Sequence, residues 1–396
     1  MKSPEKQIAD FLTRSVENVY PKREMLEAAL ESGKPIRVYL GIDPTGPSLH
    51  IGHAIALRKL AELQKMGHEV IMLIGDFTAM IGDPTDKSAT RKQLTREEVL
   101  VNCGGYKVQA SNILDFTGKN AAKLLFNSEW LGKMLFGDVI ELASHFTVQQ
   151  MMERDMFAKR MKEERPVYLH EFMYPLMQGF DSVAMDVDLE IGGNDQTFNM
   201  LAGRTLMKEV AGKEKMVLTT KLLADATGKK MGKSEGNMVA LSDAPEEMYG
   251  KIMSWTDGMI LNGFELCTDL SLEEIAGIGN SMLAGENPVK FKHQLAFEIV
   301  KAFLGEGPAN TAREHFDRVH KGGETPEEIT EYQMDSGATL ADVLVGSGLV
   351  ASKSEARRQI EQGGVKVDGV VANDIMTQVQ SGSVIQKGKR FFVKVV

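Results

Sequence analysis

Two histidines three residues apart stand at the start of a predicted helix. His50 and His53 belong to the sequence HIGH, which follows a β-branched, apolar stretch at 36–43 (IRVYLGID) that predicts a strand ending before Pro44. Side chains three apart share one helix face, and a helix N-terminus favours anions. Donors placed there suit a phosphate chain that gains charge in a transition state. The alternative is one capping and one partly buried histidine; zinc is disfavoured, because HxxH has no third ligand nearby.

A lysine-rich segment follows the last predicted strand of the first half. Residues 226–237 (ATGKKMGKSEGN) have no periodicity and predict an exposed loop. The segment is not a P-loop, because three residues rather than four separate Gly228 from Gly232 and no helix clearly begins after it. Lysines on a glycine loop can close over a polyphosphate, and a solvated run of charge is the alternative.

A third set of polar residues shares one face of a predicted helix at 170–185. Tyr174, Gln178 and Asp181 fall at i, i+4 and i+7, a stripe that suits the wall of a polar pocket, unless it is simply a solvent face. The stretch GGNDQ follows a predicted strand, where glycines permit close approach of a ligand and Asp195 could accept hydrogen bonds from ribose hydroxyls.

The elements that must position these residues alternate between strand and helix. A strand at 36–43, a helix after His50 and a strand at 68–76 form a βαβ unit, and the pattern recurs after residue 170. We therefore predict an α/β protein with a Rossmann-like parallel-sheet domain, an all-α domain and a small α+β domain. The predicted boundaries are 1–238 for the parallel-sheet domain, 239–320 for the α-helical domain, 321–336 for a linker and 337–396 for the last domain; the resemblance given below implies that the first is catalytic and the last binds RNA.

Composition excludes several classes of protein. The chain has 396 residues, a formal charge of −9 and two cysteines, which cannot build a disulfide framework. The start lacks the apolar core of a signal peptide and no run is long enough to span a bilayer, so we expect a cytoplasmic protein that does not enter a membrane. Residues 337–396 hold eight Lys/Arg against five Asp/Glu, a charge of +3, which leaves −12 on the rest. The net charge therefore excludes only indiscriminate nucleic-acid binding.

The order of these motifs carries a family resemblance. HIGH after the first strand and KMGKS after the last resemble the signature pair of class I aminoacyl-tRNA synthetases. YLGIDPTGPSLHIGH, IGDPTDK, the stripe on the helix and GGNDQ resemble the tyrosyl-tRNA synthetase family. The tail from residue 338 resembles the S4 RNA-binding domain that bacterial-type members append. The resemblance covers essentially the whole chain.

The resemblance implies a role for each matching residue. Tyrosine would be bound by Tyr39 and Asp181 at its hydroxyl group, by Asp83, Tyr174 and Gln178 at its ammonium group, and by Gln196. The catalytic residues would be His50, His53, Thr45, Lys230 and Lys233. ATP would also contact Gly41, Asp43, Gly193, Asp195 and Ser234. Lys87 and Arg91 resemble a stretch near the phosphates or the tRNA acceptor end, and RNA would contact Lys353, Arg357 and Arg358.

The implied reaction joins tyrosine to tRNA(Tyr) through an adenylate. ATP is a substrate with Mg²⁺ accompanying it, and no metal site held by the protein is expected. Two positions depart from the family pattern: Gly232 stands where serine is commoner, and Glu190 where many members have glutamine. The rival functions are a tryptophanyl enzyme, which would lack the S4 tail, and a non-catalytic RNA-binding protein.

A run of methionines raises the question of a homodimer. The resemblance places the interface of a homodimer in this region, although methionines at helical spacing are most often core residues. The residues concerned are Met151, Met152, Met156 and Met161.

Overall fold

The computed structural model describes residues 3–84, 94–224, 238–321, 329–334, 338–350, 352–388 and 391–396. The chain divides into two compact units, Met1–Ala312 and Arg313–Val396. Each unit has a sheet of its own, of six strands in the first and five in the second. Among the described helices, none combines the length and the apolar character that a membrane crossing requires.

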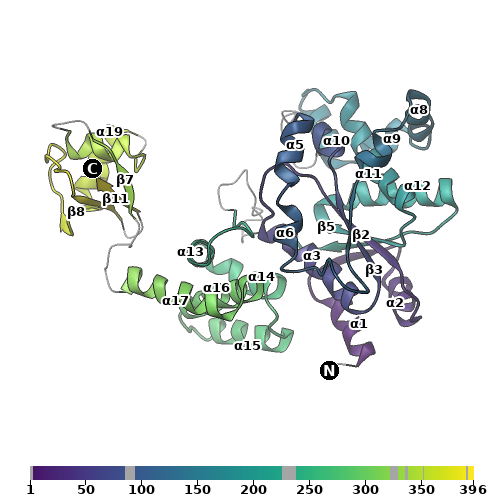
Figure 1. The fold of residues 1–396 in the computed structure, drawn as a ribbon, viewed down its shortest axis with the longest axis horizontal. Coiled ribbons are helices and arrows are strands. Elements are labelled where there is room, and N and C mark those ends of the chain that lie inside the picture. The colour runs from purple at the N-terminus through teal and green to yellow at the C-terminus, as the bar shows by residue number, and fades with distance from the viewer. Residues whose placement is uncertain are drawn as a thin grey trace. The chain divides into compact units, whose positions relative to one another are not determined.

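A six-stranded sheet forms the centre of the first unit (Figure 1). Its order is β1-β6-β5-β2-β3-β4, with all neighbours parallel except β1, which runs antiparallel to β6. The strands are β1 (Val16–Tyr20), β2 (Arg37–Ile42), β3 (Glu69–Ile74), β4 (Lys123–Phe126), β5 (Leu189–Gly193) and β6 (Met216–Thr220). Because β2 lies between β3 and β5, the strand order reverses there, and ligands of open α/β sheets bind at such a switch point.

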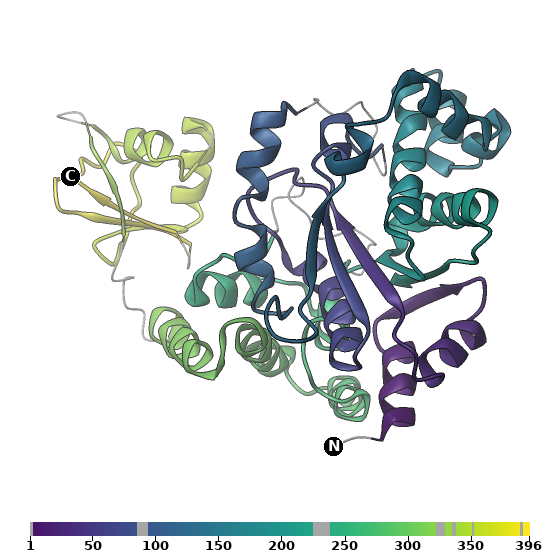
Figure 2. The same cartoon turned by 45° about the vertical axis from the view of Figure 1, so that its right-hand side comes forward.

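Three helices hold the functional segments against this sheet. Helix α3 (Ile51–Lys65) packs on β2, β3 and β5, while α11 (Leu169–Met185) and α12 (Thr197–Ala211) lie side by side (Figure 2). Gly179 and Gly203 let α11 and α12 approach, since a Cβ at Gly179 would lie 3.1 Å from the Gly203 backbone nitrogen. The predicted βαβ unit and the helix bearing the polar stripe are therefore present.

The other described helices up to residue 321 fall into three groups along the chain. On the amino-terminal side are α1 (Pro4–Thr13) and α2 (Arg23–Glu31). Between β3 and α11 the structure has α4 (Thr78–Ile81), α5 (Arg96–Cys103), α6 (Tyr106–Ala110), α7 (Ser128–Leu131), α8 (Phe136–Ser144), α9 (Val148–Met152) and α10 (Asp155–Lys162). The helices that follow β6 are α13 (Pro245–Met253), α14 (Ile260–Cys267), α15 (Leu272–Leu283), α16 (Pro288–Leu304) and α17 (Glu306–Lys321).

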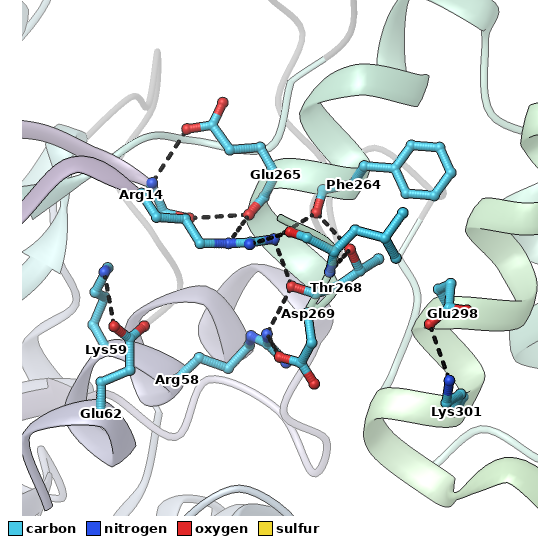
Figure 3. A network of polar contacts seen from close by, with 12 residues as sticks. Arg14, Arg58, Lys59, Glu62, Phe264, Glu265, Thr268, Asp269, Glu298 and Lys301 are labelled. Atoms are coloured by element: carbon cyan, nitrogen blue, oxygen red, sulfur yellow. Dashed lines mark hydrogen bonds and ion pairs between the residues drawn. The ribbon is translucent and has the colours of Figure 1, made fainter. Parts of the chain in front are cut away.

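Two arginines tie the end of α14 to α1 and α3 (Figure 3). The guanidinium of Arg14, after α1, donates to the carbonyls of Phe264, Glu265, Thr268 and Leu270 at the end of α14. Arg58 on α3 donates to the Thr268 carbonyl at 2.8 Å and to Asp269. These bonds satisfy carbonyls that a helix C-terminus leaves unpaired, so α14 is anchored to the helix that carries the HIGH histidines.

The second unit is a small α+β structure. Its sheet has the order β7-β11-β10-β8-β9 and an apolar core that includes Leu340, Leu344, Ile360 and Ile385. The elements are β7 (Thr330–Tyr332), α18 (Leu340–Gly346), α19 (Lys353–Glu361), β8 (Val365–Val367), β9 (Val370–Val371), β10 (Val384–Lys387) and β11 (Phe391–Val395).

The predicted fold class is confirmed, with one difference in detail. Strand β7 lies within 321–336, which we predicted as a linker, and pairs in parallel with β11. Backbone bonds hold these three residues in the sheet, and Thr330 and Glu331 are exposed, so no apolar pattern marks the strand. The boundaries of the three predicted domains stay a prediction.

Candidate active site

A cavity of about 970 Å³ opens at the carboxyl ends of β2 and β5. It gathers residues from segments far apart in the sequence: the end of β2, the start of α3, the stripe on α11 and the turn after β5. Of the predicted residues, those lining it are Tyr39, Gly41, Asp43, Thr45, His50, His53, Asp83, Tyr174, Gln178, Asp181, Gly193, Asp195 and Gln196. The helical stripe therefore faces a pocket rather than solvent.

Tyr39 and Asp181 form the deepest polar part of the cavity wall. The Tyr39 ring is fully buried against Ile71, Leu73 and Val187, and its hydroxyl lies 3.0 Å from Ser182 Oγ. Burial raises the pKa of Tyr39, and the carboxylates of Glu190 and Asp181 raise it further. The phenol is therefore neutral and can donate a hydrogen bond.

Two side chains that the sequence did not single out hold Asp181. Asn127 Nδ2 donates to Asp181 Oδ2 at 3.2 Å, and Trp130 Nε1 donates to Oδ1 at 2.7 Å. Burial raises the pKa of Asp181 well above its ordinary value, against the opposing effect of these two donors. The carboxyl group is thus fixed in orientation, and one more donor from a ligand would favour its ionised form.

The opposite part of the wall is a chain of acids and hydroxyl groups. Tyr174 donates to Asp43 Oδ2 at 2.8 Å, and Thr78 donates to Asp43 Oδ1 at 2.7 Å. Asp83 accepts from Gln196 Nε2 at 2.7 Å and from Arg154 at 3.1 Å. Of the predicted tyrosine-binding residues, Tyr174 is therefore held by Asp43, and Gln196 and Asp83 hold each other.

Hydrogen bonds from the backbone determine the tautomers of both histidines. His50 Nδ1 accepts from the Gly52 amide at 3.1 Å, and His53 Nδ1 accepts from the His50 amide at 3.1 Å. A ring nitrogen that accepts carries no hydrogen, so each neutral ring carries its hydrogen on Nε2. Burial lowers the pKa of His50 to about 4 and that of His53 well below its ordinary value, and His50 lowers the latter further.

The two rings stack, with centroids 3.7 Å apart. A Cβ at Gly52 would lie 2.9 Å from the His50 ring, so this glycine makes room for the ring itself. His50 caps α3, as expected if one histidine of the pair were a capping residue, and it also lines the cavity. The site therefore receives neutral N–H donors from this helix start.

Several predicted residues lie elsewhere. Lys87, Arg91, Lys230, Gly232, Lys233 and Ser234 are outside the described residues. Lys353, Arg357 and Arg358 lie on α19 of the second unit, where they are exposed, and Lys353 pairs with Asp342 at 2.7 Å. Among the described residues no three His, Cys, Asp or Glu side chains gather as metal ligands, and the expected absence of a protein-held metal stays a prediction.

Some residues around the cavity were not predicted. Asn127 and Trp130 follow β4, and their place after a short apolar run was the signal that could have marked them. Arg154 and Lys215 carried no such signal, because their partners Asp83 and Glu190 are distant in the sequence.

Comparison with known proteins identifies the class to which this fold and cavity belong. Residues 31–321 match the model of the family "tRNA synthetases class I (W and Y)", and residues 339–385 match the S4 domain. The chain therefore belongs to the class I aminoacyl-tRNA synthetases for tryptophan and tyrosine.

Relatives of known function show which of the two amino acids, tryptophan or tyrosine, is the substrate. The chain is 44% identical over 386 residues to a tyrosine–tRNA ligase of Haemophilus ducreyi, covering 97% of this chain and 96% of that one. It is 45% identical over 397 residues to one of Thermotoga maritima, covering 99% and 98%. The predicted function, a tyrosine–tRNA ligase, is confirmed, and ATP is a substrate of this reaction.

Solved structures support the fold. The mitochondrial tyrosyl-tRNA synthetase of Aspergillus nidulans superposes with a TM-score of 0.65 at 22% identity, covering 81% of this chain and 94% of that one. The tyrosyl-tRNA synthetase of Archaeoglobus fulgidus, solved in complex with L-tyrosine, superposes with a TM-score of 0.61 at 22% identity. The match covers 78% of this chain and 100% of that one. At these identities the likeness concerns the fold alone.

Proposed function

We propose that the cavity binds tyrosine and ATP together and that its residues act as the sequence implied. The observation that carries the proposal is the pairing of a buried phenol donor, Tyr39, with a fixed carboxyl group, Asp181, in one cavity with the histidine donors. A hydroxyl group both accepts and donates, so tyrosine satisfies both. Phenylalanine brings a partner to neither group, the kind of loss that gives about 10⁵ discrimination in tyrosyl-tRNA synthetases.

The ammonium group of tyrosine would lie at the acidic part of the wall. Asp83, Tyr174 and Gln178 offer a carboxylate and two neutral oxygens to this cation, and Gln196 holds Asp83 in place. Tyr174 keeps its hydrogen on the bond to Asp43, because burial and the carboxylates of Asp43 and Asp83 raise its pKa. Its oxygen lone pairs therefore remain available as acceptors.

The chemical step requires positioning and charge stabilisation. A carboxylate oxygen of tyrosine attacks the α-phosphorus of ATP, a new P–O bond forms, and the bond to pyrophosphate breaks. His50 and His53 would donate Nε2–H to phosphate oxygens as charge shifts, and their neutrality fits a role as donors rather than as general acids. Thr45 would assist from the turn after β2.

The remaining parts of ATP have candidate partners around the same cavity. Asp195 and Gly193 would hold the ribose, with Gly41 and Asp43 close to the nucleotide. Lys230, Lys233 and Ser234 would close over the pyrophosphate. Mg²⁺ would enter with ATP, bridging its phosphates as part of the substrate.

In the second step the terminal ribose hydroxyl of tRNA(Tyr) attacks the adenylate and displaces AMP. Lys353, Arg357 and Arg358 support an RNA contact on α19, because they are exposed cations on one short helix. We place the reaction in the cytoplasm, as expected from the sequence.

A homodimer is supported by exposed apolar side chains on neighbouring helices. Phe136 and Ile140 on α8, Val148 on α9 and Leu169 at the start of α11 are exposed, with 81% exposure at Phe136 and at Leu169. Met161 is exposed as well, whereas Met151 is buried in a local core. We propose that a second copy of the chain covers this apolar face.

Amino-acid-dependent exchange of pyrophosphate into ATP tests the proposal. We expect exchange with tyrosine and neither with tryptophan nor with phenylalanine at matched concentrations. Tyr39→Phe should lower the preference for tyrosine over phenylalanine while leaving the KM for ATP unchanged. Exchange with tryptophan would redirect the assignment, and an unaltered preference in the variant would remove Tyr39 from the binding site.

A further inference from the structure

A fully buried lysine lies behind the cavity wall and contacts two residues, Ser182 and Glu190, that are hydrogen-bonded to residues of the proposed tyrosine site. Lys215 directly precedes β6 and its side chain is inaccessible to solvent. Its ammonium group donates to Ser182 Oγ at 2.7 Å, to the Met200 carbonyl at 3.2 Å and to the carboxylate of Glu190. All three donors of the ammonium are thus used, as burial of a cation requires.

The space for this ammonium is built into the helix packing. A Cβ at Gly203 on α12 would lie 2.5 Å from Lys215 Nζ and 2.9 Å from Ser182 Oγ. Glycine at position 203 therefore leaves room for the contact between the Lys215 ammonium group and the Ser182 hydroxyl group. Neither Lys215 nor Ser182 is among the described residues that line the cavity, so any influence on a ligand passes through their partners.

The first partner is Ser182, which connects Lys215 to Tyr39. An ammonium cannot accept, so Lys215 donates to Ser182 Oγ. Among the described residues, the acceptor left for the Ser182 hydrogen is Tyr39 Oη, at 3.0 Å. Tyr39 then keeps its own hydrogen to donate: the Glu190 carboxylate, which itself lines the cavity, is an acceptor beside it, and the Gln178 carbonyl at 3.5 Å is at the limit of hydrogen-bond distance.

The second partner is Glu190, which connects Lys215 to Gln178. One carboxylate oxygen of Glu190 meets Lys215, and the other accepts from Gln178 Nε2 at 3.0 Å. Because a carboxylate only accepts, the amide nitrogen of Gln178 is turned toward Glu190. The amide oxygen of Gln178 is left as an acceptor, which is what an ammonium group needs.

We propose that Lys215 is a positioning residue for tyrosine recognition, acting through Ser182 on the direction in which Tyr39 donates and through Glu190 on the orientation of Gln178. This inference rests on the proposed tyrosine site and adds to it a residue that does not touch the substrate. A buried ion pair of this kind is weak support for stability by itself, but it can fix a single arrangement of polar groups.

Two variants test the two connections in the full-length chain. Lys215→Met combined with Glu190→Gln removes both buried charges together, and Ser182→Ala breaks only the connection to Tyr39. In the pyrophosphate exchange assay we expect the double variant to raise the KM for tyrosine about 10- to 100-fold, with the KM for ATP within about twofold of wild type. Ser182→Ala should lower the preference for tyrosine over phenylalanine about 10-fold, again with an unchanged KM for ATP.

Lys59→Met is the matched control. Lys59 is also buried, donates to the Phe11 carbonyl at 2.7 Å and pairs with Glu62, but none of these residues lines the cavity. It should lose stability without a change in the KM for tyrosine or in the preference over phenylalanine.

Two results would overturn the inference. One is a folded double variant and a folded Ser182→Ala protein that both keep the wild-type KM for tyrosine and the wild-type preference within twofold. The other is a Lys59→Met protein with the same losses as the Lys215 variant. Absence of tyrosine-dependent exchange in the wild type would instead refute the proposed function itself, so the two failures are distinguishable.

Discussion

The dependence of the free energy of unfolding on acidic pH tests whether His50 is neutral in the folded protein. Burial lowers its pKa to about 4, whereas an unfolded chain has a histidine pKa of about 6.5. Between these values the unfolded chain binds a proton that the folded chain does not. The free energy of unfolding therefore falls as the pH falls through this window, and above about pH 7 the histidine adds no pH dependence.

The magnitude follows from the two pKa values. The full difference in pKa lowers the free energy of unfolding by about 3 kcal/mol once the pH is below about 4. About 2 kcal/mol of this decrease falls between pH 7 and pH 5. His50→Asn is the comparison, because asparagine can also cap α3 by accepting from the Gly52 amide and does not titrate. We expect the wild type to lose about 2 kcal/mol more than this variant over the same pH interval.

Urea unfolding followed by tryptophan fluorescence is the assay. The chain has two tryptophans, Trp130 and Trp255, and both lie in the unit Met1–Ala312, so the signal reports the unit that contains His50. Equal losses in wild type and variant would refute the reasoning. So would a His50 Cε1 resonance that titrates with a midpoint near 6.5, measured by NMR on protein with labelled histidine.

Three further predictions concern the surface, the packing and the pocket. Leu169→Glu should convert a dimer to a monomer in sedimentation velocity, whereas Leu283→Glu, 88% exposed on α15, should leave the dimer intact; a wild-type monomer at micromolar concentration would contradict the proposed interface. Arg14→Met should lower the free energy of unfolding by about 3 kcal/mol in the urea assay, because the four hydrogen bonds from its guanidinium to carbonyls are lost, and an unchanged midpoint would contradict that role. Trp130→Phe should raise the KM for tyrosine about 10-fold through the loss of the bond to Asp181, and a KM for ATP that rises equally would point to a general defect.

The sequence predicted the parts of the site that depend on local spacing. Tyr174, Gln178 and Asp181 share a face because helical period alone puts them there, and His50 stands at the start of α3 because a strand and a turn precede it. Parallel strands bring the ends of β2 and β5 to one edge, so the gathering of these segments also followed from the alternation of strand and helix.

The contacts that hold those residues could not be predicted in the same way. Asp181 depends on Asn127 and Trp130, and Glu190 on Lys215, and these pairs are joined only by the order of strands in the sheet. The spacing of residues along the sequence therefore does not predict such pairs. The glycine in HIGH shows a related limit: a Cβ at Gly52 would collide with the His50 ring, and this contact depends on where that ring lies rather than on spacing in the sequence.

The charged side chains that line the cavity bear on how the site would hold the phosphates of ATP. The described lining includes the carboxyl groups of Asp43, Asp83, Asp181, Glu190 and Asp195, and both histidines are neutral. Lys221 is the single lysine or arginine in that described lining, and it already pairs with Glu265 at 2.8 Å. Asp83 is paired with Arg154 and Glu190 with Lys215, and the remaining carboxyl groups of this wall favour the ammonium group of tyrosine over a polyphosphate. The proposed roles of Mg²⁺ and of the lysines at 226–237 fit this charge, because each would bring positive charge to the phosphates of ATP.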